Sequence, residues 1–594
     1  MKHLRLSVLL FAVTLSAVAA GRSVSLSDYA SDRAGDDWSP ALSLALSQAD
    51  TVLVPAGTYK ISAVSLPSGK TIIGEGHRTV FVALSSAVFS SEGVTGKAIP
   101  IEEDIVDFSS TIVVRNAEFL CPGDVILLRS QRNCMVKEDC GEWALGQTVV
   151  NHKTCFYGEF LEVSSIDGGK ISLKSSPVFP FYKKDCSAES VRDGFATRPC
   201  STVQKMTLVE NVTLKNFDVA TNASCNSVLC FKAARNCMAE NITAFNNEPF
   251  AKSSRLFVLQ DCISCKLVSC ASFCTPEMKE SALKGFEKTY ENYGKYNNFR
   301  LMSCTDCSLE SCNDNFATHA FSITYSGMPS IRCRIVGCKS IDSIWAGVIS
   351  QQNTPWSELV ANTVINAGQG VFAGCRWSKV MNNYVKTDLP FSTNHYYTHL
   401  SRGGTVGIGL FEGYARSCVV SGNTVSGFYT GISVHDGYEK LNVFDDYSDI
   451  VIKGNKVSGC VQGFLVSKNK YNVRRAELGI TLENNSFKGL GYEITIDGNI
   501  RSGFGVRLPG CSGVTVTGND ISDYKFGVHM NSFPDSIFVE GNRIGICRYG
   551  VYLSKEESNP ERLVSHLRIR KNSMFEIEKD EYGGFSQPFV KMIK

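Results

Sequence analysis

The sequence predicts an all-β chain that coils as a parallel β-helix, and three observations lead to this prediction. Short strands with alternating apolar and polar residues recur along the C-terminal half, with Gly or Asn at the corners. Self-similar units return at a period near 30 residues, and no helical pattern separates them. The length of 594 residues is too great for one compact core but ordinary for a solenoid that grows by stacking coils.

The repeat is clearest where residues 419–427 match residues 451–459. An asparagine follows a strand in each unit, at intervals of 32, 30, 34, 23 and 30 residues: Asn423, Asn455, Asn485, Asn519, Asn542 and Asn572. Each unit reads as one wrap of the chain. In stacked wraps the asparagines fall into line, and a ladder of side-chain amides can hydrogen-bond from coil to coil.

The same position can be followed upstream, where it is occupied in turn by Asn383, Asn362, Cys338, Cys312, Cys270, Asn241 and Asn211. A second position, five residues earlier, holds Cys265, Cys307, Cys333 and Cys418. We interpret these as inward thiol stacks, because a free cysteine behaves as a small buried hydrophobe. The alternative to thiol stacking is a zinc site from the Cys262–Cys265 and Cys304–Cys307 pairs. Before the regular coils, disulfides are expected to join Cys134 to Cys140 and Cys155 to Cys186 or Cys200.

Residues 1–20 are expected to be a secretory signal peptide. A basic start is followed by an apolar run and by small residues before Gly21. That run is too short for a good membrane span, and no later segment reaches the length a span needs. We therefore expect a secreted, periplasmic or cell-surface protein. The net charge of +2 favours neither nucleic acid nor an anionic membrane as a partner.

The N-terminal segment carries a family resemblance. Residues 52–59 read VLVPAGTY and residues 66–76 read LPSGKTIIGEG. This pattern resembles the opening of the pectate-lyase-like superfamily of right-handed parallel β-helix proteins, which includes polysaccharide lyases, glycoside hydrolases and tailspike-like proteins. The resemblance implies a capping helix near Ala41–Leu46 and first coils within residues 21–80, in one β-helix domain over residues 21–594. A stretch from Gly123 to Leu173 is similar to the early region of tailspike-like β-helices.

The resemblance is specific for the fold and leaves the reaction open. The full motif set of polygalacturonase-like hydrolases is missing, as is the Asp-Pro-His block of alginate epimerases. Two insertions interrupt the ladder, at about 275–298 and 386–404, and long insertions on a solenoid often lie on its binding face.

The repeat frame predicts a strip of outward residues on one face. In the unit 431–436, Ile432 and Val434 should point inward, and His435 and Asp436 outward or to the strand end. The corresponding pairs in neighbouring coils are Thr324 and Tyr325, Gln351 and Gln352, Cys375 and Arg376, Phe411 and Glu412, and Ser467 and Lys468. The predicted catalytic residues are Glu412, Asp436 and His435, and the predicted substrate-binding residues are Arg376, Gln351, Tyr325, His399, Arg402 and Trp377.

This strip supports two kinds of glycan cleavage. Hydrolysis would use a carboxylic acid with a carboxylate, such as Glu412 and Asp436. β-Elimination of a uronate would need a base and a cation near the sugar carboxylate, with Arg376 or bound Ca²⁺ as the cation. No protein metal ligands are assigned. The rival hypotheses are a non-catalytic glycan-binding adhesin, a purely structural β-helix, and a strip that is an ordinary solvated strand end. The glycan and the oligomeric state stay open.

Overall fold

The structure is a computed structural model. It describes residues 21–106, 108–134, 155–183, 201–222, 224–246, 255–280, 296–388, 405–410, 415–435, 449–467, 477–496, 498–509, 511–531, 535–554 and 567–579.

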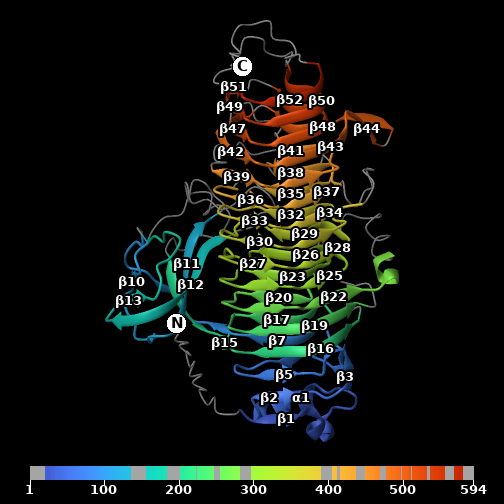
Figure 1. The fold of residues 1–594 in the computed structure, drawn as a ribbon. Coiled ribbons are helices and arrows are strands. Elements are labelled where there is room, and N and C mark those ends of the chain that lie inside the picture. The colour runs from blue at the N-terminus through green and yellow to red at the C-terminus, as the bar shows by residue number, and fades with distance from the viewer. Residues whose placement is uncertain are drawn as a thin grey trace, which may run out of the picture.

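The chain winds as a single-stranded right-handed parallel β-helix, so the predicted fold class is confirmed (Figure 1). Three ladders of parallel strands run along the axis. The first ladder contains β1 (Ser23–Ser25), β2 (Thr51–Leu53), β5 (Thr71–Ile73), β16 (Thr213–Thr221), β19 (Met238–Asn246), β21 (Lys266–Val268), β24 (Ser308–Glu310), β27 (Arg334–Val336), β30 (Glu358–Val360), β33 (Lys379–Met381), β36 (Val419–Ser421), β39 (Ile450–Lys453), β42 (Glu477–Glu483), β47 (Ser512–Thr517), β49 (Asp535–Glu540) and β51 (Arg568–Arg570).

The second ladder runs through β16 and β19 as well, since these longer strands turn the corner between two ladders. Its other members are β3 (Gly57–Ile61), β6 (Thr79–Ala83), β22 (Ala271–Cys274), β25 (Asn313–Asp314), β28 (Lys339–Ile341), β31 (Thr363–Ile365), β34 (Tyr384–Lys386), β37 (Thr424–Ser426), β40 (Lys456–Ser458), β43 (Ser486–Gly491), β48 (Asp520–Asn531), β50 (Arg543–Ser554) and β52 (Ser573–Lys579).

The third ladder carries the candidate site. It contains β4 (Val64–Ser65), β7 (Ala87–Glu92), β17 (Ser227–Lys232), β20 (Phe257–Gln260), β23 (Asn297–Met302), β26 (Ala317–Thr324), β29 (Ser343–Ser350), β32 (Gln369–Ala373), β35 (Val406–Leu410), β38 (Thr430–His435), β41 (Gln462–Ser467) and β46 (Phe504–Pro509), and it continues into β48, β50 and β52.

Alternation along each strand builds the core. In the third ladder one inward row consists of Val371, Ile408, Ile432, Phe464 and Val506, which pair in register and are fully buried. Because side chains point alternately to the two faces of a strand, the neighbours of these residues point outward. Stacking thus turns a period-2 pattern into one continuous apolar column.

The asparagine ladder is confirmed. From Asn362 to Asn542, each asparagine donates its backbone N–H to the Oδ1 of the next asparagine along the axis, at 2.8–3.0 Å. The residue before each rung takes a left-handed conformation, such as Gly422 with φ of 65°. A Cβ on Gly422 would lie 2.4 Å from Asn382 Oδ1, so glycine also relieves a close approach here.

The upstream end of this ladder needs a correction. The pairing of Glu240 with Val268 puts Ile242 beside Cys270, and Phe217 pairs with Ile242. Ile242 and Phe217 therefore occupy the position that the sequence reading gave to Asn241 and Asn211. Asn241 sits one residue earlier, in the left-handed position, and its Nδ2 donates to Asn216 Oδ1 at 3.0 Å. Both positions of the corner accept asparagine, which is why the reading slipped by one residue.

The thiol stacks are inward, as predicted. Cys265 and Cys307 are fully buried, and the Sγ of each accepts the backbone N–H of the cysteine one coil earlier, at 3.3 Å. Within the described ranges, no three His, Cys, Asp or Glu side chains gather as a metal site would require. Cys140, Cys186 and Cys200, the proposed disulfide partners, lie outside the described residues.

Helix α1 (Ser39–Gln48) lies at the N-terminal end of the coils (Figure 1). Its apolar face, with Leu42, Ala45 and Leu46, is buried in the same core as the strands. Two short 3₁₀ segments, η1 (Leu26–Asp32) and η2 (Gly76–Arg78), complete this end. No helix among the described residues has the length and apolar character needed to span a membrane.

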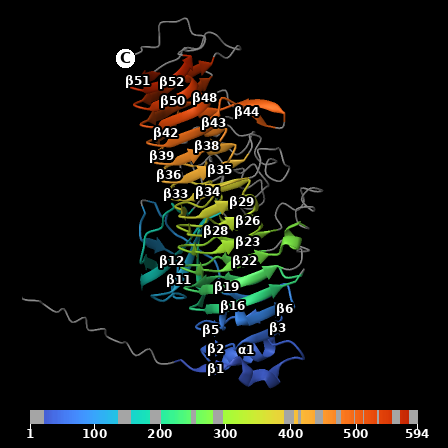
Figure 2. The ribbon, with the colours of Figure 1, turned by 45° about the vertical axis from the view of Figure 1, so that its right-hand side comes forward.

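Residues between the first coils and β16 form an accessory sheet, which the sequence reading did not separate from the coils. Its strands pair antiparallel and lie at one side of the solenoid (Figures 1 and 2). They are β8 (Val94–Thr95), β9 (Ile99–Pro100), β10 (Thr111–Val113), β11 (Val125–Asn133), β12 (Phe156–Asp167), β13 (Lys170–Leu173) and β14 (Thr202–Thr207). A separate apolar cluster with Ile126, Leu128 and Tyr157 lies in this sheet, so the accessory sheet and its loops form a lobe with a hydrophobic core of its own.

Two small pairs complete the described strands. Strands β15 (Val209–Glu210) and β18 (Ala234–Arg235) pair in parallel, and β44 (Glu493–Ile496) forms a hairpin with β45 (Asn499–Ser502) that projects from the coils (Figure 2). The two expected insertions follow β22 and β34, and most of both lies outside the described residues.

Candidate functional site

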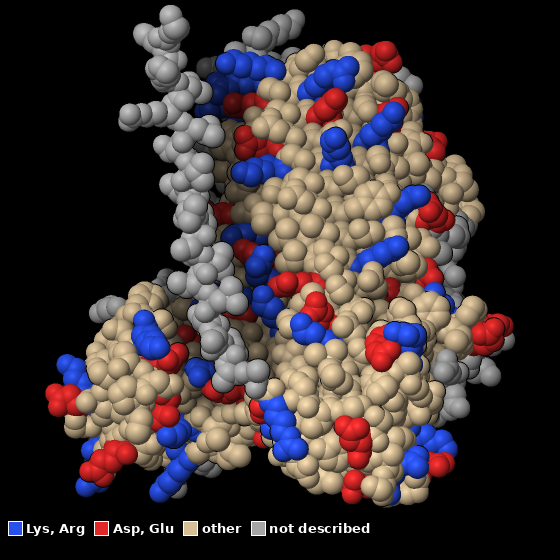
Figure 3. All heavy atoms as spheres, turned by 60° about the horizontal axis from the view of Figure 1, so that its bottom comes forward, with Lys and Arg blue, Asp and Glu red and all other residues tan. Residues whose placement is uncertain are grey.

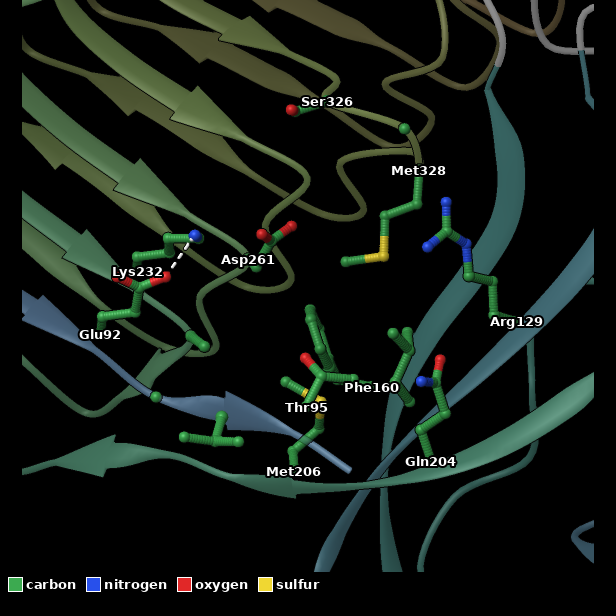
Figure 4. A pocket seen from close by; sticks show the side chains of 15 residues that line it. Glu92, Thr95, Arg129, Phe160, Gln204, Met206, Lys232, Asp261, Ser326 and Met328 are labelled. Carbon is green, nitrogen blue, oxygen red and sulfur yellow. Dashed lines mark hydrogen bonds and ion pairs between the residues drawn. The ribbon is translucent and has the colours of Figure 1, made fainter. Parts of the chain in front are cut away.

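A pocket lies where the ends of the third-ladder strands meet the accessory sheet. Its volume is about 630 Å³. One wall comes from the ends of β7 and β17 and from the turns after β20 and β26, and the other comes from β8, β11, β12 and β14 (Figure 4). We call this pocket the groove. A buried cluster with Leu127, Phe160, Met206, Ala233 and Met328 joins the two walls and holds them together.

The coil wall of the groove carries two carboxyl groups and a lysine. Glu92 and Lys232 end neighbouring strands that pair in register, and Lys232 Nζ lies 2.5 Å from Glu92 Oε1. The hydrogen bond from Lys232 to Glu92 raises the pKa of Lys232 above its usual value. Asp261 follows directly after β20, one coil further along, because Lys232 pairs with Gln260. The parallel register thus stacks ionisable residues that are far apart in sequence.

Asp261 is the most perturbed acid in the groove. Burial and, to a smaller extent, the neighbouring Cys304 raise its pKa to about 7, against lowering effects from a hydrogen bond with Gln260 and from the charges of Lys232 and Arg129. Its backbone is left-handed, with φ of 54°, and its N–H donates to Met302 O at 2.9 Å. A carboxyl group with this pKa can both hold and release a proton near neutral pH, as a general acid must.

The accessory wall presents Arg129 and Gln204. Arg129 projects from β11 on the side opposite Asp261 (Figure 4). The Arg129 guanidinium carbon lies 5.7 Å from the centroid of the Phe156 ring. Gln204 is held by a hydrogen bond from its Nε2 to Gly96 O at 3.0 Å. Charged residues therefore approach the groove from both of its walls.

The predicted strip is partly brought together. Ile323 pairs with Ser350, and Ser350 pairs with Ala373, so Thr324, Gln351 and Gly374 fall in one row and Tyr325, Gln352 and Cys375 in the next. Arg376 is one position beyond these rows, which corrects its predicted placement beside Tyr325 and Gln352. The pairing of Ser350 with Ala373 puts Gly374, and not Cys375, beside Gln351. The Arg376 side chain is buried and lies over the Trp377 ring, 5.0 Å from the centroid.

The other described residues of the strip are engaged with the protein. Gln351 accepts a hydrogen bond from Thr324 at 2.5 Å, and Tyr325 accepts one from Gln352 at 3.0 Å. Tyr325 packs against the core of the accessory sheet. The ring of Trp377 stacks on that of Trp356, with centroids 4.5 Å apart, so the ring that was expected to bind sugar faces another tryptophan.

The predicted catalytic group falls largely outside the described residues. Glu412, Asp436, His399 and Arg402 are not described, and of His435 only the main chain is, in register with Ser467. Their proposed roles remain predictions.

Sequence reasoning missed the groove. Glu92, Lys232 and Asp261 each lie at the end of a strand in one ladder, and the repeat frame could have placed them in neighbouring rows. The predicted strip begins at Thr324 and Tyr325, so it does not include these three residues. Arg129 and Gln204 have no repeat signal, since they belong to the accessory sheet.

The charge distribution agrees with the composition. On the face that Figure 3 draws, Lys and Arg alternate with Asp and Glu, and no single-sign patch of the kind that binds nucleic acid is evident.

Comparisons with known protein families and solved structures identify similar folds. A family model for the right-handed β-helix region matches residues 445–583. No curated protein matches the chain in sequence. Among solved structures, the chain is similar to the tailspike gp61 of Pseudomonas phage phi297, with 14% identity, a TM-score of 0.52, and coverage of 91% of this chain and 83% of that one.

Two other tailspikes give similar values. The Gp54 tailspike of Acinetobacter baumannii bacteriophage AP22, solved in complex with A. baumannii capsular saccharide, has 12% identity, a TM-score of 0.51, and coverage of 92% and 79%. The tailspike gp49 of Pseudomonas phage LKA1 has 12% identity, a TM-score of 0.50, and coverage of 90% and 74%. The coil geometry, the asparagine ladder and these comparisons together show that the chain has the right-handed parallel β-helix fold.

Proposed function

We propose that the protein acts outside the cytoplasm on a polysaccharide or complex glycan, and that it hydrolyses a glycosidic bond in the groove. The observation that carries this proposal is the position of Asp261, a carboxyl group with a pKa of about 7, in a pocket that also contains the Glu92 carboxylate. Glycoside hydrolysis requires one protonated and one ionised carboxyl group on either side of the scissile bond.

The roles follow from the two environments. Asp261, half-buried, would donate its proton to the oxygen of the leaving sugar while the bond from that oxygen to the anomeric carbon breaks. Glu92, exposed and paired with Lys232, would accept a proton from water as the water oxygen bonds to the anomeric carbon. One water is consumed, and the cycle closes when Glu92 releases its proton to solvent and Asp261 takes one up.

The pocket has room for this chemistry. A volume of about 630 Å³ is within the range of ligand pockets, and it combines an apolar floor with a few polar groups. The AP22 tailspike, which shares the fold, was solved with a capsular saccharide bound. That relationship supports a glycan as the ligand class and does not bear on the reaction.

The test is incubation of the protein with uronate-containing and neutral glycans. New reducing ends without ultraviolet absorbance are expected, since hydrolysis creates no unsaturated sugar. Absorbance from an unsaturated sugar would replace hydrolysis by elimination. Binding without any cleavage would identify a glycan-binding adhesin.

A matched pair of variants tests the residue assignment. Asp261→Asn keeps the shape of the side chain and removes the acid, so we expect activity to fall about 100-fold or more. Asp520→Asn makes the same change at an exposed aspartate that pairs with Arg543 and lies in β48, away from the groove. Full activity in Asp261→Asn would remove Asp261 from the mechanism.

A further inference from the structure

The two walls of the groove differ from its floor in chemistry. Glu92, Lys232 and Asp261 line the coil wall, and Arg129 faces them from the accessory sheet (Figure 4). Between the walls lie four apolar side chains that are at most 7% exposed: Leu127, Phe160, Met206 and Met328. A ligand in this groove would meet charge at its sides and an apolar surface beneath it.

Arg129 has no acidic partner of its own. Among the residues that the structure describes, no carboxylate lies within 4.0 Å of its side-chain nitrogens, and its guanidinium rests over the Phe156 ring instead. A planar guanidinium that is half-buried and without a carboxylate favours a bidentate anion such as a carboxylate.

The groove carries a net positive charge that comes from Arg129. Glu92 and Lys232 neutralise each other, and Asp261 is largely uncharged when it acts as the acid. The groove then carries the surplus positive charge of Arg129, which an anionic sugar would balance.

The apolar floor favours a methyl group. Met328 reaches the accessory sheet at Gly158, where an added Cβ would lie 2.9 Å from Met328 Sδ, so this methionine bridges the two walls at the floor of the groove. The hydroxyl groups of an unmodified sugar would lose water here without gaining partners. The methyl group of an N-acetyl substituent would instead be buried against methionine and phenylalanine.

We propose, on the basis of the function proposed above, that the groove selects a sugar that carries both a carboxylate and an N-acetyl group. Arg129 binds the carboxylate, and the floor around Met206 and Met328 receives the N-acetyl methyl group. Neither neutral nor unacylated sugars use both surfaces.

Binding of the carboxylate also affects the acid. Asp261 faces Lys232 and Arg129, which lower its pKa, and the Cys304 thiol, while Glu92 lies across from it beside Lys232. A substrate carboxylate on Arg129 offsets the field of that guanidinium, so Asp261 holds its proton to a higher pH in the complex.

The test uses four sugars that vary the two substituents independently on one ring: 2-acetamido-2-deoxyglucuronic acid, glucuronic acid, N-acetylglucosamine and glucose. Their dissociation constants are measured by NMR titration of the Asp261→Asn protein, which binds without turnover. We expect 2-acetamido-2-deoxyglucuronic acid to bind most tightly. Loss of the carboxylate should weaken binding about 10-fold or more, and loss of the N-acetyl group about 3- to 10-fold.

Two variants assign the effects to residues. Arg129→Gln should remove the advantage of the acidic sugars and leave the N-acetyl advantage intact, and Arg129→Lys should restore part of the first. Met328→Gln should remove the advantage of the N-acetylated sugars and leave the advantage of the acidic sugars intact. Thermal unfolding confirms that each variant is folded. Equal affinity for the four sugars, or an equal loss for all of them in Arg129→Gln, would overturn the inference, as would the absence of binding by any of them.

The outcomes separate this inference from the proposed function. If the protein cleaves a glycan in an Asp261-dependent reaction but shows no preference among the four sugars, only the proposed sugar selectivity is refuted. If the protein shows the expected binding preference but cleaves no glycan, only the proposed hydrolysis is refuted.

Discussion

Asn423 donates its side-chain Nδ2 to the Oδ1 of Asn455 at 2.9 Å, and its backbone N–H donates to the same oxygen at 3.0 Å. Asn455 in turn donates from Nδ2 to Val420 O and to Asn485 Oδ1. One buried side chain therefore satisfies polar groups in three coils. Asn455→Ala should lower the free energy of unfolding by about 3 kcal/mol or more, because several buried donors and acceptors lose their partners together.

Denaturant unfolding measures this effect. Lys456→Ala, at the exposed next residue, is the matched control and should change stability by less than about 0.5 kcal/mol. Equal effects at the two positions would mean that the ladder contributes little to stability.

The end of the solenoid offers a second prediction. Leu46 on α1 is 1% exposed and packs on the first coils, as a cap requires. Leu46→Ala should destabilise the protein by about 2–5 kcal/mol, while Ser43→Ala on the exposed face of the same helix should be nearly neutral. Thermal unfolding of the two variants distinguishes a cap from a helix that merely rests on the surface, for which both changes would be small.

The raised pKa of Asp261 predicts the pH dependence of cleavage. Activity depends on the protonated acid, so kcat/KM should fall as the pH rises through about 7. A pH profile of the wild-type protein measures this limb. A profile that stays flat from pH 6 to pH 9 would contradict the role of Asp261 as the acid.

Asp261 also affects the pH dependence of stability, in the direction opposite to that of an ordinary salt-bridged aspartate. The folded protein binds the Asp261 proton more tightly than the unfolded chain, whose aspartates have a pKa of about 3.9. Stability from this group is thus fully present below about pH 4 and is lost as the pH rises to about 7. Asp261→Asn should remove this pH-dependent component. As the pH rises from about 4 to about 7, the melting temperature of the variant should therefore increase relative to that of the wild-type protein.

The strip expected from the sequence and the groove found in the structure make different predictions. If the groove holds the acid, Glu412→Gln and Asp436→Asn should raise KM more than they lower kcat. Steady-state kinetics of these variants beside Asp261→Asn decides between the two. A loss of about 100-fold in kcat at Glu412 or Asp436, with Asp261→Asn active, would return the site to the strip.

The buried thiols give a chemical prediction. Burial raises the pKa of Cys418 and of Cys460 to about 12, whereas Cys121 is exposed to solvent. Alkylation followed by mass spectrometry should label Cys121 in the native protein and the other two only after unfolding, since the thiolate is the reactive form. Rapid native labelling of Cys418 would contradict its inward position.

Periodicity made the coils predictable. The spacing of Asn423 and Asn455 fixes how one wrap lies on the next, and a ladder residue repeated at the same place needs no long-range information. Errors arose where that signal was ambiguous. Asn241 fits the ladder pattern because asparagine suits both corner positions. The predicted position of Arg376 is off by one residue because the repeat frame places one residue too many between the paired residues Ser350 and Ala373.

The sequence alone determined the solenoid, its inward and outward faces and the glycan hypothesis, because these follow from local alternation and from a repeated motif. Only the tertiary structure decided that residues 94–207 leave the coils as an antiparallel lobe, and that Arg129 on this lobe faces Asp261 across one groove. That arrangement depends on the packing of Phe160, Met206 and Met328 between two bodies. Contacts of this kind join segments without a common period, and no repeat in the chain encodes them.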